Sequence, residues 1–219
     1  MLHELRFLMR LSVIISFLFI SSLEPLLAQN AYVRLGRQAY ADGDFKTAVK
    51  QLEKACLIDS TNANALWMLG YSYYHSDNYL KSIVAFTKEL SITPTDAYAY
   101  YYMAQAKSRL GRDNQLLPAD KEKYLYEAIF NYSKAIEINP TDSKIASFYQ
   151  NRGIAYRDYA QFKLDPNSHA YYDKARGMKA LRAAIDDFQK VLTDNPARTD
   201  IASLLDQSKE KLVSNVGHH

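Results

Sequence analysis

The chain has 219 residues, 48% hydrophobic and 23% charged, a balance that excludes wholesale disorder and collagen-like structure. Its 27 basic and 24 acidic residues give a net charge of +3, which carries no electrostatic signature of nucleic-acid binding. With only 7 glycines and 6 prolines, it has too few turn formers for an all-β fold. The single cysteine, Cys56, excludes an intrachain disulfide and an all-cysteine metal site. Tyrosine is unusually frequent, with 18 residues.

Residues 1–28 have the order of a secretory signal peptide. Arg6 and Arg10 precede an apolar run from Leu11 to Ile20, and the small residue Ala28 follows it. This run is too short to cross a bilayer, which takes about 20 residues. We therefore expect cleavage near Ala28, no stable membrane span in the mature chain, and export to the periplasm or cell envelope of a bacterium. An uncleaved anchor is the alternative.

A spacing of 34 residues organises the chain after the leader. It separates four pairs of similar residues: Gly36 and Gly70, Phe45 and Tyr79, Ala48 and Ser82, and Leu52 and Phe86. Later copies keep this frame but are longer, because Pro94, Pro140 and Pro196 are spaced more widely. A repeat of this length predicts stacked supersecondary units, each of which buries its apolar face against its neighbours.

The text of each copy fits two antiparallel helices. In the second copy, 63–76 and 78–92 have helical patterns. Gly70 lies inside the first of these helices, where glycine costs about 1 kcal/mol relative to alanine, so we expect close approach of a neighbouring helix there. After Pro94, Asp96 is placed to cap the next helix, and residues 139–142 repeat this arrangement.

The copies resemble the tetratricopeptide repeat (TPR), whose pattern is W-x2-L-G-x2-Y, then A-x3-F, then P. The second copy carries it at Leu69, Gly70, Tyr73, Ser82, Phe86 and Pro94. The match is weaker in the last copy, where Arg152 replaces the usual leucine. The resemblance implies an all-α fold, a right-handed TPR superhelix (α-solenoid). We expect about four helix-turn-helix repeats (29–62, 63–96, 97–142 and 146–196), making a TPR domain over 29–196, followed by a C-terminal capping helix and tail at 197–219.

Two insertions lengthen the later copies. Pro118 and Asp120 indicate a helix start, so 119–138 is predicted to be one lengthened second helix. In the other insertion, 164–169 reads as a turn and 170–192 as a long helix.

By the same resemblance, the first helix of each repeat lines a concave groove. Helical spacing places a set of aromatic and basic residues on that side: Tyr40, Trp67, Tyr71, Tyr74, Tyr98, Tyr101 and Arg109. Tyrosine and tryptophan combine large apolar area with a polar group, so we expect this groove to bind an extended or helical segment of another protein. The alternative is that the rings only fill space between helices. Four other tyrosines are expected in the core: Tyr73, Tyr79, Tyr100 and Tyr132.

No reactive constellation accompanies the repeats. His75 and His169 lack a ligand at metal spacing, Cys56 is predicted to be a buried and inert thiol, and no nucleophile elbow, P-loop or zinc motif occurs. We therefore predict a non-catalytic protein-binding scaffold with no catalytic residue, no cofactor and no metal site.

Two alternatives to the scaffold stay open. One is a small-ligand binder or enzyme, with a pocket built by 161–180 in which Asp173, Arg176 and His169 converge. The other is a structural protein that associates with itself through its aromatic face.

Overall fold

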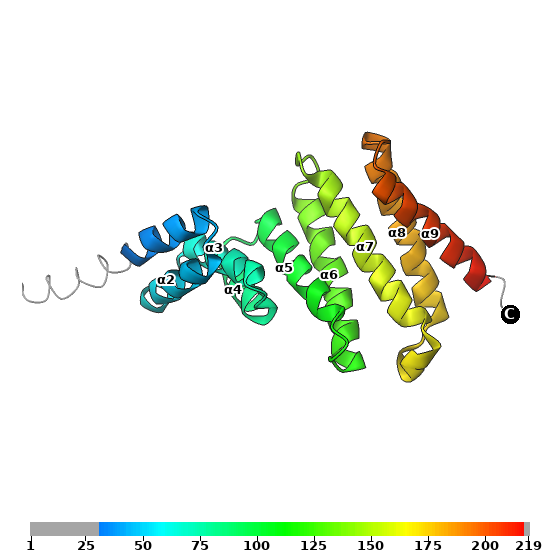
Figure 1. The fold of residues 1–219 in the computed structure, drawn as a ribbon, viewed down its shortest axis with the longest axis horizontal. Helices are drawn as coiled ribbons and strands as arrows, with labels where there is room; N and C mark the ends of the chain where they lie inside the picture. Colours follow the sequence, from blue (N-terminus) through cyan, green and yellow to red (C-terminus); the bar gives the residue numbers. More distant parts are fainter. Residues whose placement is uncertain (1–30, 217–219) are drawn as a thin grey trace, which may run out of the picture. The chain divides into compact units, whose positions relative to one another are not determined.

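The computed structural model describes residues 31–216, and the predicted signal peptide lies outside them. Within that range the regular structure is entirely helical, apart from turns and one 3-10 segment (Figure 1). The helices form two compact units, the first ending at Asp77 and the second beginning at Asn78.

The first unit contains a helix over 31–41, α2 (Phe45–Ile58) and α3 (Ala63–His75). Short polar side chains start both labelled helices. Asp44 accepts a hydrogen bond from the Thr47 amide, and Asn62 accepts one from the Ala65 amide, each at 3.0 Å. α2 packs against α3, and Ala48, Leu52 and Ala55 of α2 are buried. Cys56, predicted to be buried, is only half-buried because it lies beside this packed face.

Close helix approach occurs at repeat glycines. A Cβ atom added to Gly36 would lie 2.6 Å from Leu52 Cγ, and one added to Gly153 would lie 2.7 Å from Phe188 Cε1. Leu52 and Phe188 are both fully buried, so neither side chain has space to retreat. These two glycines therefore allow the paired helices to touch, which is the role the sequence predicts for glycine inside a helix.

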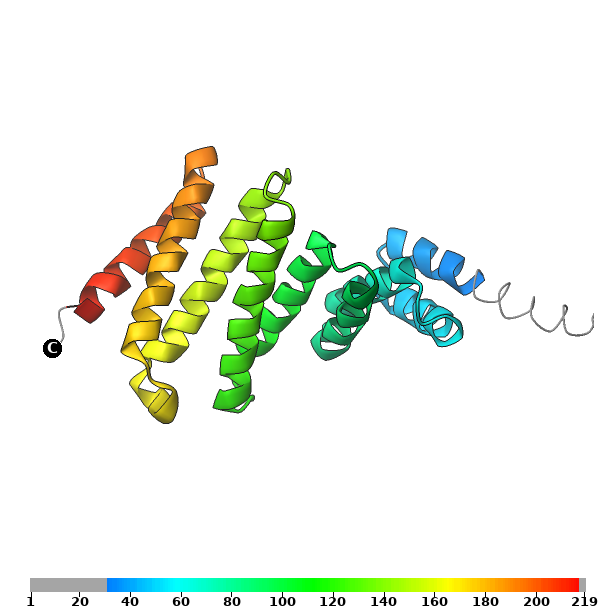
Figure 2. The same cartoon turned by 180° about the vertical axis from the view of Figure 1, so that it is seen from behind.

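The second unit is a series of helices joined by short turns (Figure 2). Its helices are α4 (Tyr79–Ile92), α5 (Ala97–Gly111), α6 (Pro118–Ile138), α7 (Ile145–Leu164), α8 (Lys174–Asp194) and α9 (Thr199–Val216). Each packs against the next in chain order, so every helix buries its apolar face on a sequence neighbour. At the end of the series, Ile201 and Leu205 of α9 pack into a cluster with Phe188 and Val191 of α8.

The two insertions compare differently with their predictions. α6 begins at Pro118 and runs to Ile138, as predicted. α8 begins at Lys174, later than the predicted residue 170, because Pro166–Tyr171 forms a 3-10 helix instead of a simple turn. Asp173 then starts α8 by accepting a hydrogen bond from the Arg176 amide at 2.9 Å.

The predicted cap at 139–142 is wrong, although the equivalent cap at Asp96 is present, with its carboxylate 2.9 Å from the Ala99 amide. α7 begins at Ile145 and has no side-chain cap. The Asp142 carboxylate instead accepts hydrogen bonds from the Lys144 amide at 2.7 Å and the Tyr98 hydroxyl at 2.9 Å. These bonds hold it in the turn before the helix.

The expected core tyrosines fall into two pairs. Tyr73 and Tyr132 are buried, and the Tyr73 hydroxyl donates a hydrogen bond to Glu53. Tyr79 and Tyr100 are half-buried.

Candidate functional site

An aromatic cluster gathers rings from three helices of the first unit. Tyr40 comes from the helix over 31–41, Phe45 begins α2, and the others follow one face of α3 at intervals of four residues. We call this set the first-unit cluster: Tyr40, Phe45, Trp67, Tyr71 and His75. Three of the seven predicted groove residues, Tyr40, Trp67 and Tyr71, therefore lie together.

The rings of the first-unit cluster contact one another directly. Tyr40 lies edge-on to Trp67 and Tyr71, with centroid distances of 6.3 and 5.3 Å. Trp67 stacks on Tyr71 at 5.4 Å, and His75 stacks on Phe45 at 4.6 Å. The rings of Tyr40, Trp67 and Tyr71 are half-buried, so each keeps a solvent-facing part. Such partly exposed aromatic surface can contact a partner without first being uncovered.

Two titratable groups of the first-unit cluster, the Tyr40 hydroxyl and the His75 imidazole, are uncharged near neutral pH. Burial raises the pKa of the Tyr40 hydroxyl, and the neighbouring Tyr71 raises it further. Burial lowers the pKa of His75 from its usual value of 6.5, so its imidazole is neutral near pH 7. The cluster therefore offers apolar faces and neutral hydrogen-bonding groups.

The other predicted groove residues have different surroundings. Tyr74 lies on α3 with its ring edge-on to His75, at a centroid distance of 5.1 Å. In the second unit, Tyr98 lies edge-on to Phe148 at 5.6 Å, and Tyr101 stacks on the same ring at 4.5 Å. Arg109 is exposed in the last turn of α5.

Tyr98 and Tyr101 are tied to later parts of the chain by their hydroxyls. The Tyr101 hydroxyl accepts a hydrogen bond from Asn151 Nδ2 at 2.6 Å, and the Tyr98 hydroxyl donates to Asp142. Both rings thus join α5 to α7 or to the turn before it. This resembles the space-filling role that the sequence left as the alternative for these residues.

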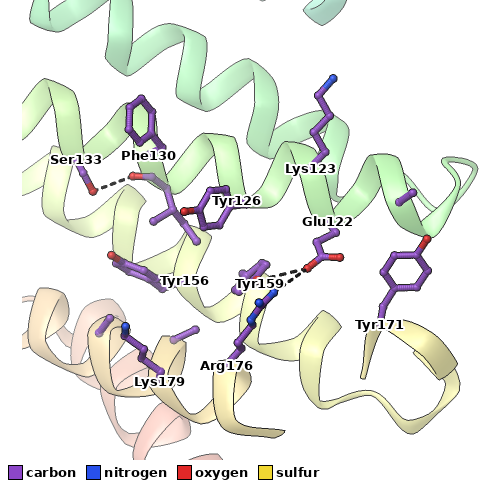
Figure 3. A pocket seen from close by; sticks show the side chains of 14 residues that line it. Glu122, Lys123, Tyr126, Phe130, Ser133, Tyr156, Tyr159, Tyr171, Arg176 and Lys179 are labelled. Carbon is purple, nitrogen blue, oxygen red and sulfur yellow. Dashed lines mark hydrogen bonds and ion pairs between the residues drawn. The ribbon is translucent and has the colours of Figure 1, made fainter. Parts of the chain in front are cut away.

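A second surface is a cleft between α6 and α8, with α7 beneath it (Figure 3). Its volume is about 820 Å³, within the usual range for ligand sites. We call it the α6–α8 cleft. Aromatic rings make up much of its lining: Tyr126 and Phe130 of α6, Tyr156 and Tyr159 of α7, and Tyr171.

A buried ion pair lies at one end of the α6–α8 cleft. Glu122 pairs with Lys163, whose side chain is almost completely buried, and accepts a hydrogen bond from the Tyr159 hydroxyl at 3.5 Å. Arg176 Nη1 lies 3.9 Å from the same carboxylate oxygen (Figure 3). Lys163 Nζ also donates to the Tyr171 carbonyl at 3.1 Å, which fixes the 3-10 segment over α7. The Glu122 charge is therefore already compensated.

The insertion predicted to build a pocket does contribute to this cleft, through Tyr171, Arg176, Lys179 and Ala180. The predicted convergence of Asp173, Arg176 and His169 in this pocket is only partly present. Asp173 contacts Arg176, with 3.2 Å between Oδ2 and Nε, but is not among the lining residues. The side chain of His169, the third residue of that prediction, lies outside the part of the chain that the structure describes.

Helical spacing also places His75 on the same side as Trp67 and Tyr71, where the structure has it, but sequence reasoning missed Phe45 in the first-unit cluster and all of the α6 residues of the cleft. One signal was present: Tyr126 and Phe130 are spaced by four residues on a helix face that also carries the charged residues Glu122, Lys123 and Lys134. Among residues 31–216, no group of three or more His, Cys, Asp or Glu side chains could hold a metal ion. In the same range, no helix has the length and apolar character needed to cross a membrane.

Comparison with known proteins places the fold. Residues 36–77 match the family model described as TPR repeat. The structure is similar to that of the MamA protein, with a TM-score of 0.53 and 18% identity over 88% of this chain and 96% of that one. It is also similar to the C-terminal part of a TPR repeat-containing protein from Cytophaga hutchinsonii, with a TM-score of 0.54 and 20% identity over 82% and 61%. No curated protein matches the sequence.

The helical architecture and these similarities define an all-α repeat solenoid. The chain carries a tetratricopeptide repeat at 36–77, and its fold is that of TPR proteins. Such repeats generally mediate protein–protein interaction, and the fold is consistent with an interaction scaffold.

Proposed function

We propose that this protein is a non-catalytic scaffold that binds a segment of a partner polypeptide through the first-unit cluster. The observation that carries the proposal is the meeting of Tyr40, Trp67 and Tyr71, which come from two different hairpins of the repeat. Rings from the helix over 31–41 and from α3, which α2 separates in the chain, form one continuous surface only because these helices of the first unit pack together. The TPR match at 36–77 covers all three residues.

The chemistry of this surface suits a polypeptide. Tyrosine and tryptophan are enriched among the residues that contribute most to protein interfaces, because they bury large area with few rotatable bonds. The neutral imidazole of His75 extends the stacked rings without adding charge. Apolar side chains of the partner would lie on the exposed ring faces.

The test is the double substitution Trp67→Ala with Tyr71→Ala. We expect partners captured from an envelope extract by the intact protein to be lost, or bound at least about tenfold more weakly, because two adjacent anchor residues are removed. Tyr172→Ala, a half-exposed tyrosine outside the cluster, is the matched control and should keep the partners. Circular dichroism should show unchanged helix content in both variants. Partners that remain on the double variant would show that binding occurs elsewhere.

We also propose that the protein acts in the periplasm or cell envelope of a bacterium after removal of residues 1–28. The support is the order of Arg6, Arg10, the apolar run and Ala28 in the sequence. Cell fractionation followed by mass spectrometry of the intact protein tests this. The expected result is a periplasmic or envelope species that begins near Gln29. A cytoplasmic species that retains Met1 and the leader would contradict the proposal.

A further inference from the structure

Two large aromatic side chains at the α6–α8 cleft are exposed to solvent instead of packed in the core. Tyr126 is 61% and Phe130 52% exposed, and they lie one turn apart on α6. Neighbouring rings of this size at the mouth of a cleft are unusual on a surface with no partner, and they mark interaction sites. Beneath them, Ile129 and Tyr159 are buried and provide a fixed apolar base.

The shape of the cleft favours an elongated occupant. Its lining residues on α6 run from Ala119 to Ser133 at helical spacing. At a rise of 1.5 Å per residue, this stripe is about 21 Å long. This stripe is about four helical turns long, which is more than a compact metabolite can cover. It matches the length over which an amphipathic helix lies in a groove.

The charge of the cleft selects the kind of segment. Its lining includes three basic residues with exposed side chains, Lys123, Arg176 and Lys179, of which Arg176 also pairs with Asp173 just outside the lining. The acidic residue of the lining, Glu122, is half-buried and is neutralised from below by Lys163. A ligand entering from solvent therefore meets an excess of positive charge around aromatic rings, which is complementary to acidic groups that flank an apolar side chain.

We propose that the α6–α8 cleft binds an acidic, amphipathic polypeptide segment, whose apolar face lies on Tyr126 and Phe130 and whose carboxylates pair with Arg176 and Lys179. This site is built from α6, α7, α8 and the 3-10 segment, and it shares no residue with the first-unit cluster. It is therefore a second docking surface, and its proposal does not depend on the first.

The probe is a displayed library of random peptides, each roughly 16 residues long so that a helical binder spans the cleft. The library is first depleted on a variant carrying Phe130→Ser and Lys179→Glu, and then selected on the intact protein. We expect the recovered peptides to be rich in Asp and Glu, with apolar residues three or four positions apart. Synthetic copies should bind the intact protein less well as the salt concentration rises.

Single substitutions then locate the site. Phe130→Ser and Lys179→Glu should each weaken peptide binding about tenfold, measured by fluorescence anisotropy of the labelled peptide. Val213→Ser, which also replaces an exposed apolar side chain with serine, and Lys209→Glu, which makes the same charge reversal, lie on α9 and should leave binding unaltered. Because Phe130 and Lys179 are exposed, these variants should keep the circular dichroism spectrum and melting temperature of the intact protein.

The proposal is overturned if the depleted library yields no binders, if the binders are neutral or basic, or if they bind the Phe130→Ser and Lys179→Glu variants as well as the intact protein. The Trp67→Ala, Tyr71→Ala protein should still bind these peptides. Loss of peptide binding in that protein, with its helix content retained, would refute a separate site. Retention there, with loss of the captured envelope partners, would leave both proposals standing.

Discussion

Replacing Arg152 with leucine should destabilise the protein by about 3–5 kcal/mol, even though leucine is the usual residue of the repeat at this place. Arg152 donates two hydrogen bonds to Asp187, from Nε at 2.8 Å and from Nη2 at 2.7 Å. It also donates to the Ser133 hydroxyl at 3.1 Å. Asp187 is only 2% exposed, so removal of the guanidinium would leave a buried carboxylate without its cation. The cost arises from that orphaned charge.

Urea unfolding followed by circular dichroism measures this effect. The double variant Arg152→Leu with Asp187→Ala removes both charges and should recover most of the lost stability, because exchange of a whole buried ion pair for apolar groups is often nearly neutral. The control is Arg198→Ala, which breaks an exposed pair with Asp200 and should cost no more than about 1 kcal/mol. A double variant as unstable as the single one would show that packing, and not the buried charge, sets the cost.

The loss should also depend on pH. Burial raises the pKa of the Asp187 carboxyl, and the hydrogen bonds from Arg152 oppose that rise. Without Arg152 most of this opposition is lost, although Lys190 still lowers the pKa, and the buried carboxyl takes up a proton more readily. The Arg152→Leu protein should therefore lose less stability in mildly acidic solution than in mildly alkaline solution.

The fold could be predicted from the repeat period because the same contacts between paired helices recur in each copy of the repeat. The same glycine place that begins the frame, Gly36, meets Leu52, and its counterpart Gly153 meets Phe188 at almost the same separation. Such contacts join residues of one hairpin at a similar place in each copy, so the pattern can be recognised in a single sequence. The start of α6 could likewise be predicted within one residue, because Pro118 and Asp120 are a local signal of a helix start.

Departures from the period could not be interpreted from the sequence, because their causes lie in other helices. Arg152 appeared only as a weak match to the repeat, and no local spacing links it to its partner Asp187, which lies 35 residues later in the chain. The structure brings the two together from α7 and α8, so one departure compensates for the other. Asp142 was likewise misassigned, because the Tyr98 hydroxyl that binds it lies 44 residues earlier in the chain.

In the candidate sites, too, contacts within one helix could be predicted from the sequence, whereas contacts between helices could not. Trp67 and Tyr71 could be placed on one face of α3 by helical spacing, and they do contact each other. Phe45 joins them from α2, a contact that spacing within one helix does not reveal. The α6–α8 cleft depends on three helices and on the position of the 3-10 segment, so only the exposed pair Tyr126 and Phe130 hinted at it in the sequence.

The stability of the protein should fall as pH rises through neutrality, because of one buried acid. Glu89 on α4 is 2% exposed, and its Oε2 atom has no hydrogen-bond partner. Burial, reinforced by the negative charge of Asp96, raises the pKa of Glu89 to about 7, despite a hydrogen bond with Thr93 that lowers it. The folded state therefore holds this proton more tightly than the unfolded chain, whose glutamate has a pKa of about 4.5.

The sign of this effect follows from proton binding. Below the unfolded pKa both states are protonated and the contribution of Glu89 is complete. As pH rises from there through about 7, the unfolded state loses its proton first, and stability on the order of 3 kcal/mol is lost. Glu89→Gln keeps the size of the side chain but cannot ionise. At about pH 8 this variant should unfold at higher urea concentration than the intact protein, and at about pH 5 the two should nearly coincide.

The difference between the two proteins isolates Glu89, because other groups such as His75 titrate equally in both. Burial lowers the pKa of His75, so its own contribution runs in the opposite direction and is lost as pH falls below its usual value of 6.5. Glu210→Gln, an exposed change on α9, is the matched control and should follow the intact protein at every pH. If Glu89→Gln and the intact protein showed parallel pH profiles, Glu89 would have to be ionised in the folded state, and a polar partner would have to reach its buried oxygen.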